Sequence, residues 1–179
     1  MIILMFDACV QCKIGSEDLK RLNIRAGSGV VMDDLKFGSD KIVFFSPKNA
    51  DLLRESVDKG LPYGIINAEL IHRSDSPHYA RAGIDDTIAR IMAKKKIATV
   101  FNLKLLIMNN GASRGRIIRR MKENMKRAVK YGAPVLFASC ADNKYELFSG
   151  VQIKTWAYYL GIDNFKRVKT SFDKIFKNN

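Results

Sequence analysis

Polar residues end several of the short apolar runs in this sequence, where they could act on a ligand. These residues are Asp7, Ser46, Asn67, Asn102 and Ser139, and Glu69 follows two residues after Asn67. In folds built from parallel strands, ligands bind at the carboxyl ends of the strands. The strand-end residues are therefore the first candidates for catalysis or binding.

A metal site is one hypothesis for Asp7 and Glu69. Together with the two histidines of the chain, these carboxylates could support an autonomous metal-dependent phosphohydrolase. A multi-metal hydrolase needs several histidines, and both of those present fall in one expected loop. We therefore expect no metal and no catalytic residue on this chain. We interpret Asp7 and Glu69 as hydrogen-bond acceptors for backbone N–H groups or for Arg73 and Arg81.

Cys9 and Cys12 form a C-x-x-C pair, a spacing found in zinc sites and in thiol redox sites. Zinc would need two further ligands, for which Cys140 with His72 or His78 are the candidates. A redox site would need a thioredoxin-like strand and helix around the pair. We favour two small apolar residues near a strand end. A total of three cysteines is too few for a disulfide framework and is typical of a reducing compartment.

The strongest chemical signal is a basic segment. The 179-residue chain has a net charge of +13, yet residues 1–93 are nearly neutral, at −1. Residues 94–131 contain twelve basic residues against the single acid Glu123, a net charge of +11. Such a concentration repels itself unless a polyanion or an acidic partner relieves it. Nucleic acid is therefore the first class of partner to consider.

An amphipathic helix is expected over residues 113–131, with Ser113 as its cap. Its apolar residues repeat every 3.6 positions and would pack on a sheet: Ile117, Ile118, Met121, Met125, Ala128 and Val129. Cations occupy its sides and back: Arg116, Arg119, Arg120, Lys126, Arg127 and Lys130.

Arg114 and Arg116 fall in the first turn of this helix, where the helix dipole disfavours cations unless an anion binds there. The pattern predicts a phosphate-binding face. Contact with five or six phosphates would give a log–log salt dependence with a slope of about −4 to −5.

Short apolar runs alternate with amphipathic stretches along the whole chain. The expected strands are 2–6, 30–32, 42–45, 63–67, 97–101 and 134–138, and the expected helices are 17–25, 47–59, 84–96, 113–131, 150–160 and 164–177. Continuous apolar strands are typical of parallel sheets that are covered on both faces. The alternation predicts one α/β domain over residues 1–179, either an open doubly wound sheet or a barrel. A barrel of this length would be compact or incomplete, because a full eight-fold barrel needs at least about 200 residues.

No apolar run reaches the roughly 18 residues of a membrane-spanning helix, and residues 1–6 lack the flanks of a signal peptide. We therefore expect a cytoplasmic protein with no membrane partner. The aromatic residues Trp156, Tyr158 and Tyr159 fall on an expected helix. We interpret them as packing against the core rather than stacking on bases.

The stretch from Arg81 to Gly161 carries several motifs in order. They are Arg81-Ala82-Gly83-Ile84-Asp85 before a helix, Val100-Phe101-Asn102-Leu103 at a strand end, Arg114-Gly115-Arg116-Ile117-Ile118-Arg119-Arg120-Met121-Lys122-Glu123-Asn124, and Lys130-Tyr131-Gly132-Ala133-Pro134-Val135 leading to Ala138-Ser139. In order and spacing the stretch resembles the 30-kDa protein subunit of archaeal and eukaryotic ribonuclease P, called component 3 in archaea. Residues 139–153 depart from the usual sequence of that family, since two arginines and an aspartate are missing there.

The resemblance implies an incomplete TIM-like (β/α) barrel that binds the catalytic RNA of ribonuclease P beside other protein subunits. The holoenzyme is an endoribonuclease that removes the 5′ leader from precursor tRNA, and its magnesium is expected on the RNA. This chain would then be non-catalytic and hold no cofactor. The residues expected to contact RNA are Arg81, Lys94, Lys95, Lys96, Lys104, Arg114, Arg116, Arg119, Arg120, Lys126, Arg127 and Lys130.

A protein-docking scaffold is the alternative from a different class. In that case the basic helix would bind an acidic protein surface, and RNA would be contacted mainly through a partner subunit. The two roles are compatible with each other.

Overall fold

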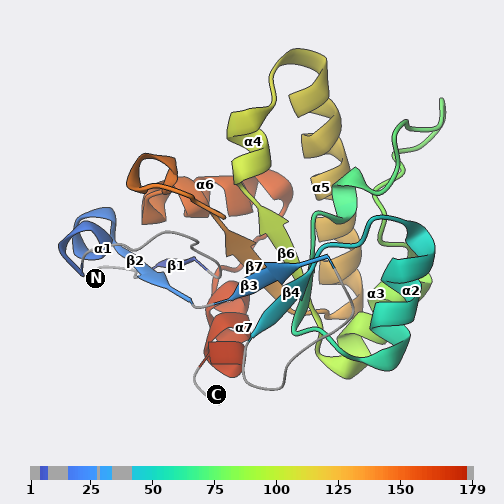
Figure 1. Ribbon diagram of the computed structural model, residues 1–179, viewed down its shortest axis with the longest axis horizontal. Helices are drawn as coiled ribbons and strands as arrows, with labels where there is room; N and C mark the ends of the chain where they lie inside the picture. The colour runs from blue at the N-terminus through green and yellow to red at the C-terminus, as the bar shows by residue number, and fades with distance from the viewer. Residues whose placement is uncertain (1–4, 8–15, 28, 34–41, 177–179) are drawn as a thin grey trace.

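The computed structural model describes residues 5–7, 16–27, 29–33 and 42–176, which form an α/β fold (Figure 1). Its strands are β1 (Met5–Asp7), β2 (Ile24–Ala26), β3 (Val30–Met32), β4 (Val43–Phe45), β5 (Gly64–Ile66), β6 (Ala98–Asn102) and β7 (Val135–Ala138). Its helices are α1 (Ser16–Leu22), α2 (Ala50–Lys59), α3 (Asp86–Lys95), α4 (Lys104–Met108), α5 (Gly111–Tyr131), α6 (Gly150–Leu160) and α7 (Lys166–Phe176), with short 3₁₀ turns η1 (Ala68–Leu70) and η2 (Lys144–Glu146). Over these residues, no helix has the length and apolar character needed to span a membrane.

The main sheet has five parallel strands in the order β3-β4-β5-β6-β7. Strands β1 and β2 form a separate parallel pair. This pair lies beside β7, where the Ser139 N–H donates to Oδ1 of Asp7 over 2.9 Å. The strands that the structure describes do not close into a full barrel. The prediction of a parallel α/β fold with outer helices is confirmed, and the barrel that these strands form is incomplete, as expected for a chain of this length.

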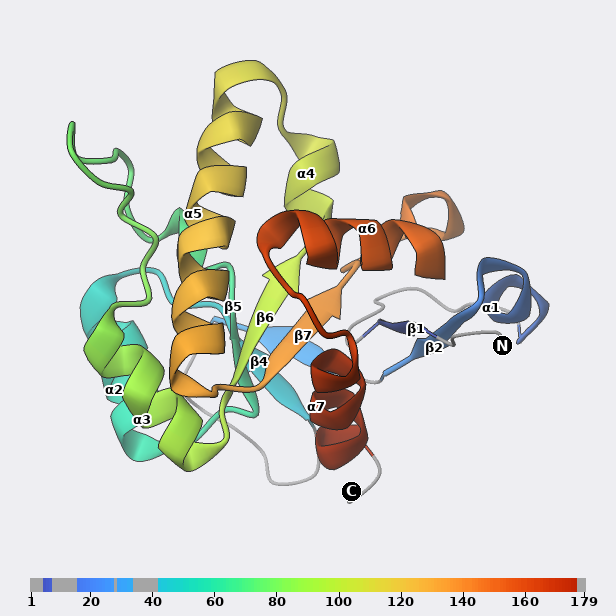
Figure 2. The ribbon, with the colours of Figure 1, turned by 180° about the vertical axis from the view of Figure 1, so that it is seen from behind.

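Both faces of the sheet are covered by helices. On one face, Phe45 and Phe137 are fully buried beneath α2, α3, α5 and α6. On the other, Phe44 packs with Phe172 and Ile175 of α7. Figure 2 shows α7 in red, separate from α2, α3, α5 and α6. Phe44 and Phe45 enter different layers because successive strand residues point to opposite faces. Helix α7 therefore covers the face that would line the interior of a closed barrel.

Several element boundaries differ from those expected. Helix α5 begins at Gly111, so Ser113 lies inside its first turn and donates from Oγ to Oδ1 of Asn109 over 2.9 Å. The prediction of Ser113 as the cap is therefore wrong. Strand β2 and helix α4 were not expected, because each is too short to show a period of its own. The expected strand 2–6 lies partly outside the described residues, and Cys9 and Cys12 lie wholly outside them.

Candidate nucleic-acid interface

The polar residues at the strand ends bond to one another. Asn67 donates from Nδ2 to Oγ of Ser46 over 3.0 Å, and Asn102 donates from Nδ2 to Oδ1 of Asn67 over 2.8 Å. Asp7 accepts the Ser139 N–H, so its interpretation as an acceptor for a backbone N–H is confirmed. These groups tie neighbouring strand ends together and are occupied by structural partners.

The histidines lie in the loop that follows η1. His72 is half-buried, and burial together with the charges of Arg81 and Arg120 lowers its pKa, so it is neutral at pH 7. His78 is exposed on the same loop. Among the described residues, no group of three or more His, Cys, Asp or Glu side chains is placed to hold a metal ion.

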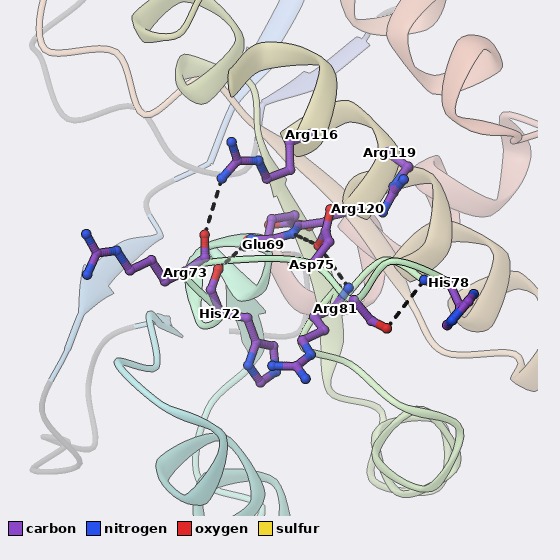
Figure 3. Close-up of polar contacts among 10 residues, drawn as sticks. Glu69, His72, Arg73, Asp75, His78, Arg81, Arg116, Arg119 and Arg120 are labelled. Atoms are coloured by element: carbon purple, nitrogen blue, oxygen red, sulfur yellow. Dashed lines mark hydrogen bonds and ion pairs between the residues drawn. The ribbon is translucent and has the colours of Figure 1, made fainter. Parts of the chain in front are cut away.

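Arg120 is buried, with only 3% of its side chain exposed (Figure 3). Its Nε donates to Oδ1 of Asp75 over 2.7 Å. Its Nη1 donates to the carbonyl oxygens of Glu69 and His72, each over 2.7 Å. The prediction that Arg120 projects from the exposed side of α5 is wrong, because the loop after η1 folds over this position. Burial alone would raise the pKa of Asp75, but the hydrogen bonds from Arg120 and from the Arg81 N–H, together with the charges of Arg120 and Arg119, outweigh it and hold that pKa below its usual value.

A row of α5 side chains holds the same loop. Arg116, Arg120 and Asn124 are four residues apart and therefore share one face of the helix. Arg116 donates from Nη1 to the carbonyl oxygen of Arg73 over 3.2 Å (Figure 3). Asn124 donates from Nδ2 to the carbonyl oxygen of Ala82 over 2.8 Å. The first and last parts of the loop are thus both bonded to α5.

Acids from elsewhere in the chain neutralise part of the basic segment. Nζ of Lys130 lies 3.0 Å from Oδ1 of Asp86, and Nε of Arg127 lies 3.9 Å from the other oxygen of that carboxylate. Lys104 pairs with Asp142. Arg119 pairs with Asp75, leaving 55% of its own side chain exposed. The charge excess is therefore smaller in space than along the sequence.

The other predicted RNA contacts divide between the two ends of α5. This helix has 21 residues and is therefore about 30 Å long. Its first turns lie beyond the carboxyl ends of the strands, and its last turn lies at their amino ends (Figure 1). Lys94, Lys95 and Lys96 end α3 at the amino end of the sheet. The structure does not bring the twelve predicted residues into one patch.

Exposed arginines gather at the carboxyl end. Figure 3 shows Arg73, Arg81 and Arg116 on α5 and on the loop beside it, and Arg114 is exposed in the first turn of the same helix. We call these four residues the carboxyl-end arginine group. Arg73 was not among the expected RNA contacts, because its segment is near-neutral in sequence. The available signal was its place in the loop that follows η1, beyond the carboxyl end of β5. Its guanidinium is exposed, while its carbonyl oxygen is bound by Arg116. The group offers planar donors suited to phosphate oxygens.

A cavity of about 1050 Å³ opens at the amino end, and Lys95, Lys96, Arg167 and Lys174 contribute its cations. Arg167 donates to the carbonyl oxygens of Ala128, Val129 and Ala133, at the end of α5. Lys95 donates to the carbonyl oxygen of Asp58 near the end of α2. These two cations compensate the negative ends of helices, which is a structural role.

The aromatic residues of α6 differ in their surroundings. Trp156 packs against the core and lies edge-on to Tyr159, with ring centroids 5.6 Å apart. Tyr158 and Tyr159 are 47% and 53% exposed, so the prediction that they pack into the core is wrong. Nζ of Lys122 lies 3.8 Å from the centre of the Tyr159 ring. The helical period of α6 is completed by Ile153, Ala157 and Leu160, which leaves both tyrosines on the outer side.

Glu69 is a buried carboxyl beneath the carboxyl-end arginine group. Burial raises its pKa from 4.5 to about 7, although Asn124 donates to its Oε1 over 3.1 Å and the Arg120 charge acts in the opposite sense. Within the described residues its Oε2 has no hydrogen-bond partner. The acceptor role expected of Glu69 is confirmed, with Asn124 as the donor in place of Arg73 or Arg81.

The raised pKa of Glu69 predicts a pH dependence of stability. Between about pH 4.5 and 7 the folded chain keeps the proton that the unfolded chain releases, so the free energy of unfolding falls as pH rises. The fall is on the order of 3 kcal/mol. We expect Glu69→Gln to lack it, and urea denaturation across this pH range measures the difference. Parallel profiles for the two proteins would contradict the prediction, and Glu146→Gln, on the exposed η2, serves as control.

Comparison with known proteins places the chain beside archaeal relatives. It is 26% identical over 129 residues to ribonuclease P protein component 3 of Methanocaldococcus jannaschii, a match covering 71% of this chain and 56% of the relative. It is 27% identical over 101 residues to the protein of the same name from Methanosarcina mazei, covering 55% of this chain and 42% of the relative. The chain thus matches about half the length of these curated relatives. No family model matches it.

A solved structure shares the fold. One chain in the cryo-EM structure of archaeal ribonuclease P with mature tRNA superposes with a TM-score of 0.57 at 21% sequence identity. The superposition covers 95% of this chain and 89% of that one. The resemblance noted in the sequence is therefore confirmed by the two named relatives, and this structure shares the fold.

Proposed function

We propose that this chain, a relative of ribonuclease P protein component 3, is an RNA-binding protein subunit of ribonuclease P. The observation that carries the proposal is the carboxyl-end arginine group, which α5 and the loop after η1 present together. The role is electrostatic and non-catalytic. The arginines neutralise phosphate repulsion, and the magnesium that supports cleavage is held by the RNA.

Recognition through this surface would follow the shape and backbone of the RNA. Arg73, Arg81, Arg114 and Arg116 present guanidinium groups, whose paired N–H donors match two phosphate oxygens. Such contacts position an RNA without reading its base sequence. The partners that we infer are the ribonuclease P RNA, other protein subunits of that enzyme, and precursor tRNA as the substrate of the assembly.

Reconstitution tests the proposal. Precursor tRNA cleavage would be measured with the ribonuclease P RNA and the other protein subunits, with and without this chain, over a series of magnesium concentrations. We expect the chain to lower the magnesium concentration needed for cleavage, because bound arginines replace counterions around the folded RNA. Cleavage that never depends on the chain, at any magnesium concentration, would reject the function.

A double substitution tests the arginine group directly. We expect Arg114→Ala with Arg116→Ala to weaken binding to the ribonuclease P RNA and to reduce the slope of log affinity against log salt by about 2, since each lost phosphate contact removes close to one. Gel-shift titration at several salt concentrations measures both quantities.

Lys94→Ala with Lys96→Ala is the matched control for this experiment. It removes the same charge from the opposite end of the molecule, and we expect a smaller change in affinity and slope. Equal effects of the two double variants would indicate binding by net charge alone. Unchanged RNA affinity in the arginine variant, with loss of assembly on the other subunits, would instead favour the docking scaffold.

A further inference from the structure

The segment between η1 and α3 contains a long loop, residues 71–82, without helix or strand. Loops of this length are uncommon inside a compact domain and usually carry function. Loop 71–82 projects from the body of the molecule beside the first half of α5 (Figures 1 and 2). It belongs to the near-neutral half of the sequence, so the charge pattern did not single it out.

A single carboxylate joins the two arms of loop 71–82. Asp75 accepts the Arg81 N–H at Oδ1 over 3.0 Å, and the same oxygen accepts Nε of Arg120 over 2.7 Å. Arg119 contacts the other oxygen over 3.0 Å. Although it stands on a projecting loop, Asp75 has only 14% of its side chain exposed. The base of the loop is therefore bonded to α5 through one ion-pair network (Figure 3).

The outer part of loop 71–82 presents cations and an aromatic ring. Arg73, His78 and Arg81 are exposed, and Tyr79 is 61% exposed. The Ser76 N–H donates to the carbonyl oxygen of Tyr79 over 3.1 Å and closes the turn at the tip. Asp75 is the single acid among these twelve residues, and it faces inward. Every formally charged side chain that the loop presents outward is thus an arginine.

We propose that loop 71–82 is an RNA-binding element in which Arg73 and Arg81 contact phosphates and Tyr79 stacks on an unpaired base. Exposed cations and an exposed aromatic ring on one surface element are the combination that binds unpaired nucleotides. Arg120 and Asp75 are positioning residues, which hold the loop without touching RNA. This inference rests on the proposed function and adds to it the stacking contact of Tyr79 and the positioning role of Asp75 and Arg120.

The tip of the loop is tested by exposed substitutions that leave the core intact. We expect Tyr79→Ala to weaken binding to the ribonuclease P RNA by about fivefold or more with an unchanged salt slope, because stacking releases no counterion. Tyr79→Phe keeps the ring and should restore the affinity. Arg73→Ala should lower both the affinity and the slope, the latter by about one. Tyr145→Ala, at a ring 86% exposed on η2, is the control and should change nothing.

The positioning role is tested by two neutralised carboxylates. Asp75→Asn and Asp86→Asn each raise the net charge by one, and each removes an acid that pairs with α5. Charge alone predicts tighter RNA binding in both. We expect Asp86→Asn to bind at least as tightly as wild type, and Asp75→Asn to lose about as much affinity as Tyr79→Ala. Limited trypsin digestion should cut after Arg73 and Arg81 faster in Asp75→Asn alone.

The outcomes separate this inference from the function on which it rests. A wild-type chain that binds no RNA overturns the proposed function. A wild-type chain that binds RNA, with Tyr79→Ala and Arg73→Ala binding as tightly as Tyr145→Ala, overturns the loop alone. Tighter binding by Asp75→Asn, in step with Asp86→Asn, overturns the positioning role. If Asp75→Asn fails to fold, the exposed variants at residues 73 and 79 decide.

Discussion

Arg120→Ala is expected to lower the free energy of unfolding by about 3 kcal/mol or more. The substitution removes a side chain that is only 3% exposed and leaves Asp75 without its closest partner. It also strips the carbonyl oxygens of Glu69 and His72 of a donor. Breaking a buried pair by removing one member costs about 3–5 kcal/mol, because the remaining charge and the polar groups stay desolvated.

Urea denaturation followed by circular dichroism measures this loss, and the neighbouring Arg119 supplies the control. Arg119 pairs with the same carboxylate, but its own side chain is 55% exposed. We expect Arg119→Ala to cost less than about 1 kcal/mol, as exposed ion pairs do. Equal losses in the two variants would show that burial of Arg120 contributes nothing, and would return it to the set of candidate RNA contacts.

Gly83→Ala is expected to lower the free energy of unfolding by about 3 kcal/mol or more, with two separable causes. Gly83 has φ +93°, a left-handed conformation that costs a residue with a Cβ about 1–2 kcal/mol. An added Cβ would also lie 2.2 Å from the carbonyl oxygen of Ala68. That oxygen belongs to η1 and cannot move as a side chain would, so the backbone must shift, at a cost of about 1–3 kcal/mol.

Gly132→Ala carries only the first of these causes and serves as the control. Gly132 has φ +83°, yet no heavy atom lies within 4 Å of the position that its Cβ would take. We expect a loss of only about 1 kcal/mol from the left-handed conformation. The difference between the two variants, measured by urea denaturation, is the cost of the contact with Ala68. Equal losses would mean that the backbone at Gly83 moves away from Ala68 at no cost, and would contradict the prediction.

Arg120 and Gly83 act on the same part of the molecule. Arg120 holds the first part of loop 71–82 against α5, and Gly83 allows the chain to pass close to η1 as it leaves the loop. Both residues stand in motifs that support the resemblance to ribonuclease P protein component 3. Their place in the structure gives a physical reason for those motifs that does not require either residue to touch RNA.

The parallel α/β fold could be predicted from local signals. Continuous apolar runs mark the buried strands β4 to β7, and the 3.6-residue period placed Ile117, Met121 and Met125 against the sheet. Short elements escaped prediction, because β2 and α4 hold only three and five residues. The position of α7 could not be read from its sequence either. An amphipathic helix shows which residues it buries and not which face of a sheet it will cover.

The candidate site was predicted in part. Arg114 and Arg116 are exposed near the start of α5, as expected, although the helix begins at Gly111 and therefore places Arg116 in its second turn. The charge count treated all twelve cations of residues 94–131 alike, so it could not separate exposed cations from buried ones. Arg119 and Arg120 are adjacent in sequence, yet one is half-exposed and the other is buried. Nothing in their local sequence distinguishes them, because the loop that covers Arg120 lies 45 residues away along the chain.

The class of fold, the amphipathic character of α5 and the concentration of positive charge near it all follow from the order of the residues. These properties depend on periodicity and composition, which are local and can be counted along the chain. Which cations remain open to a partner depends instead on how distant segments pack together. Asp75 and Asp86 belong to the near-neutral half of the sequence, yet both contact the basic helix α5. In the folded chain their negative charges therefore reduce the positive charge of that helix, although they are far from it in sequence. Electrostatic and hydrogen-bond energies depend on distance in space, and the fold alone sets that distance.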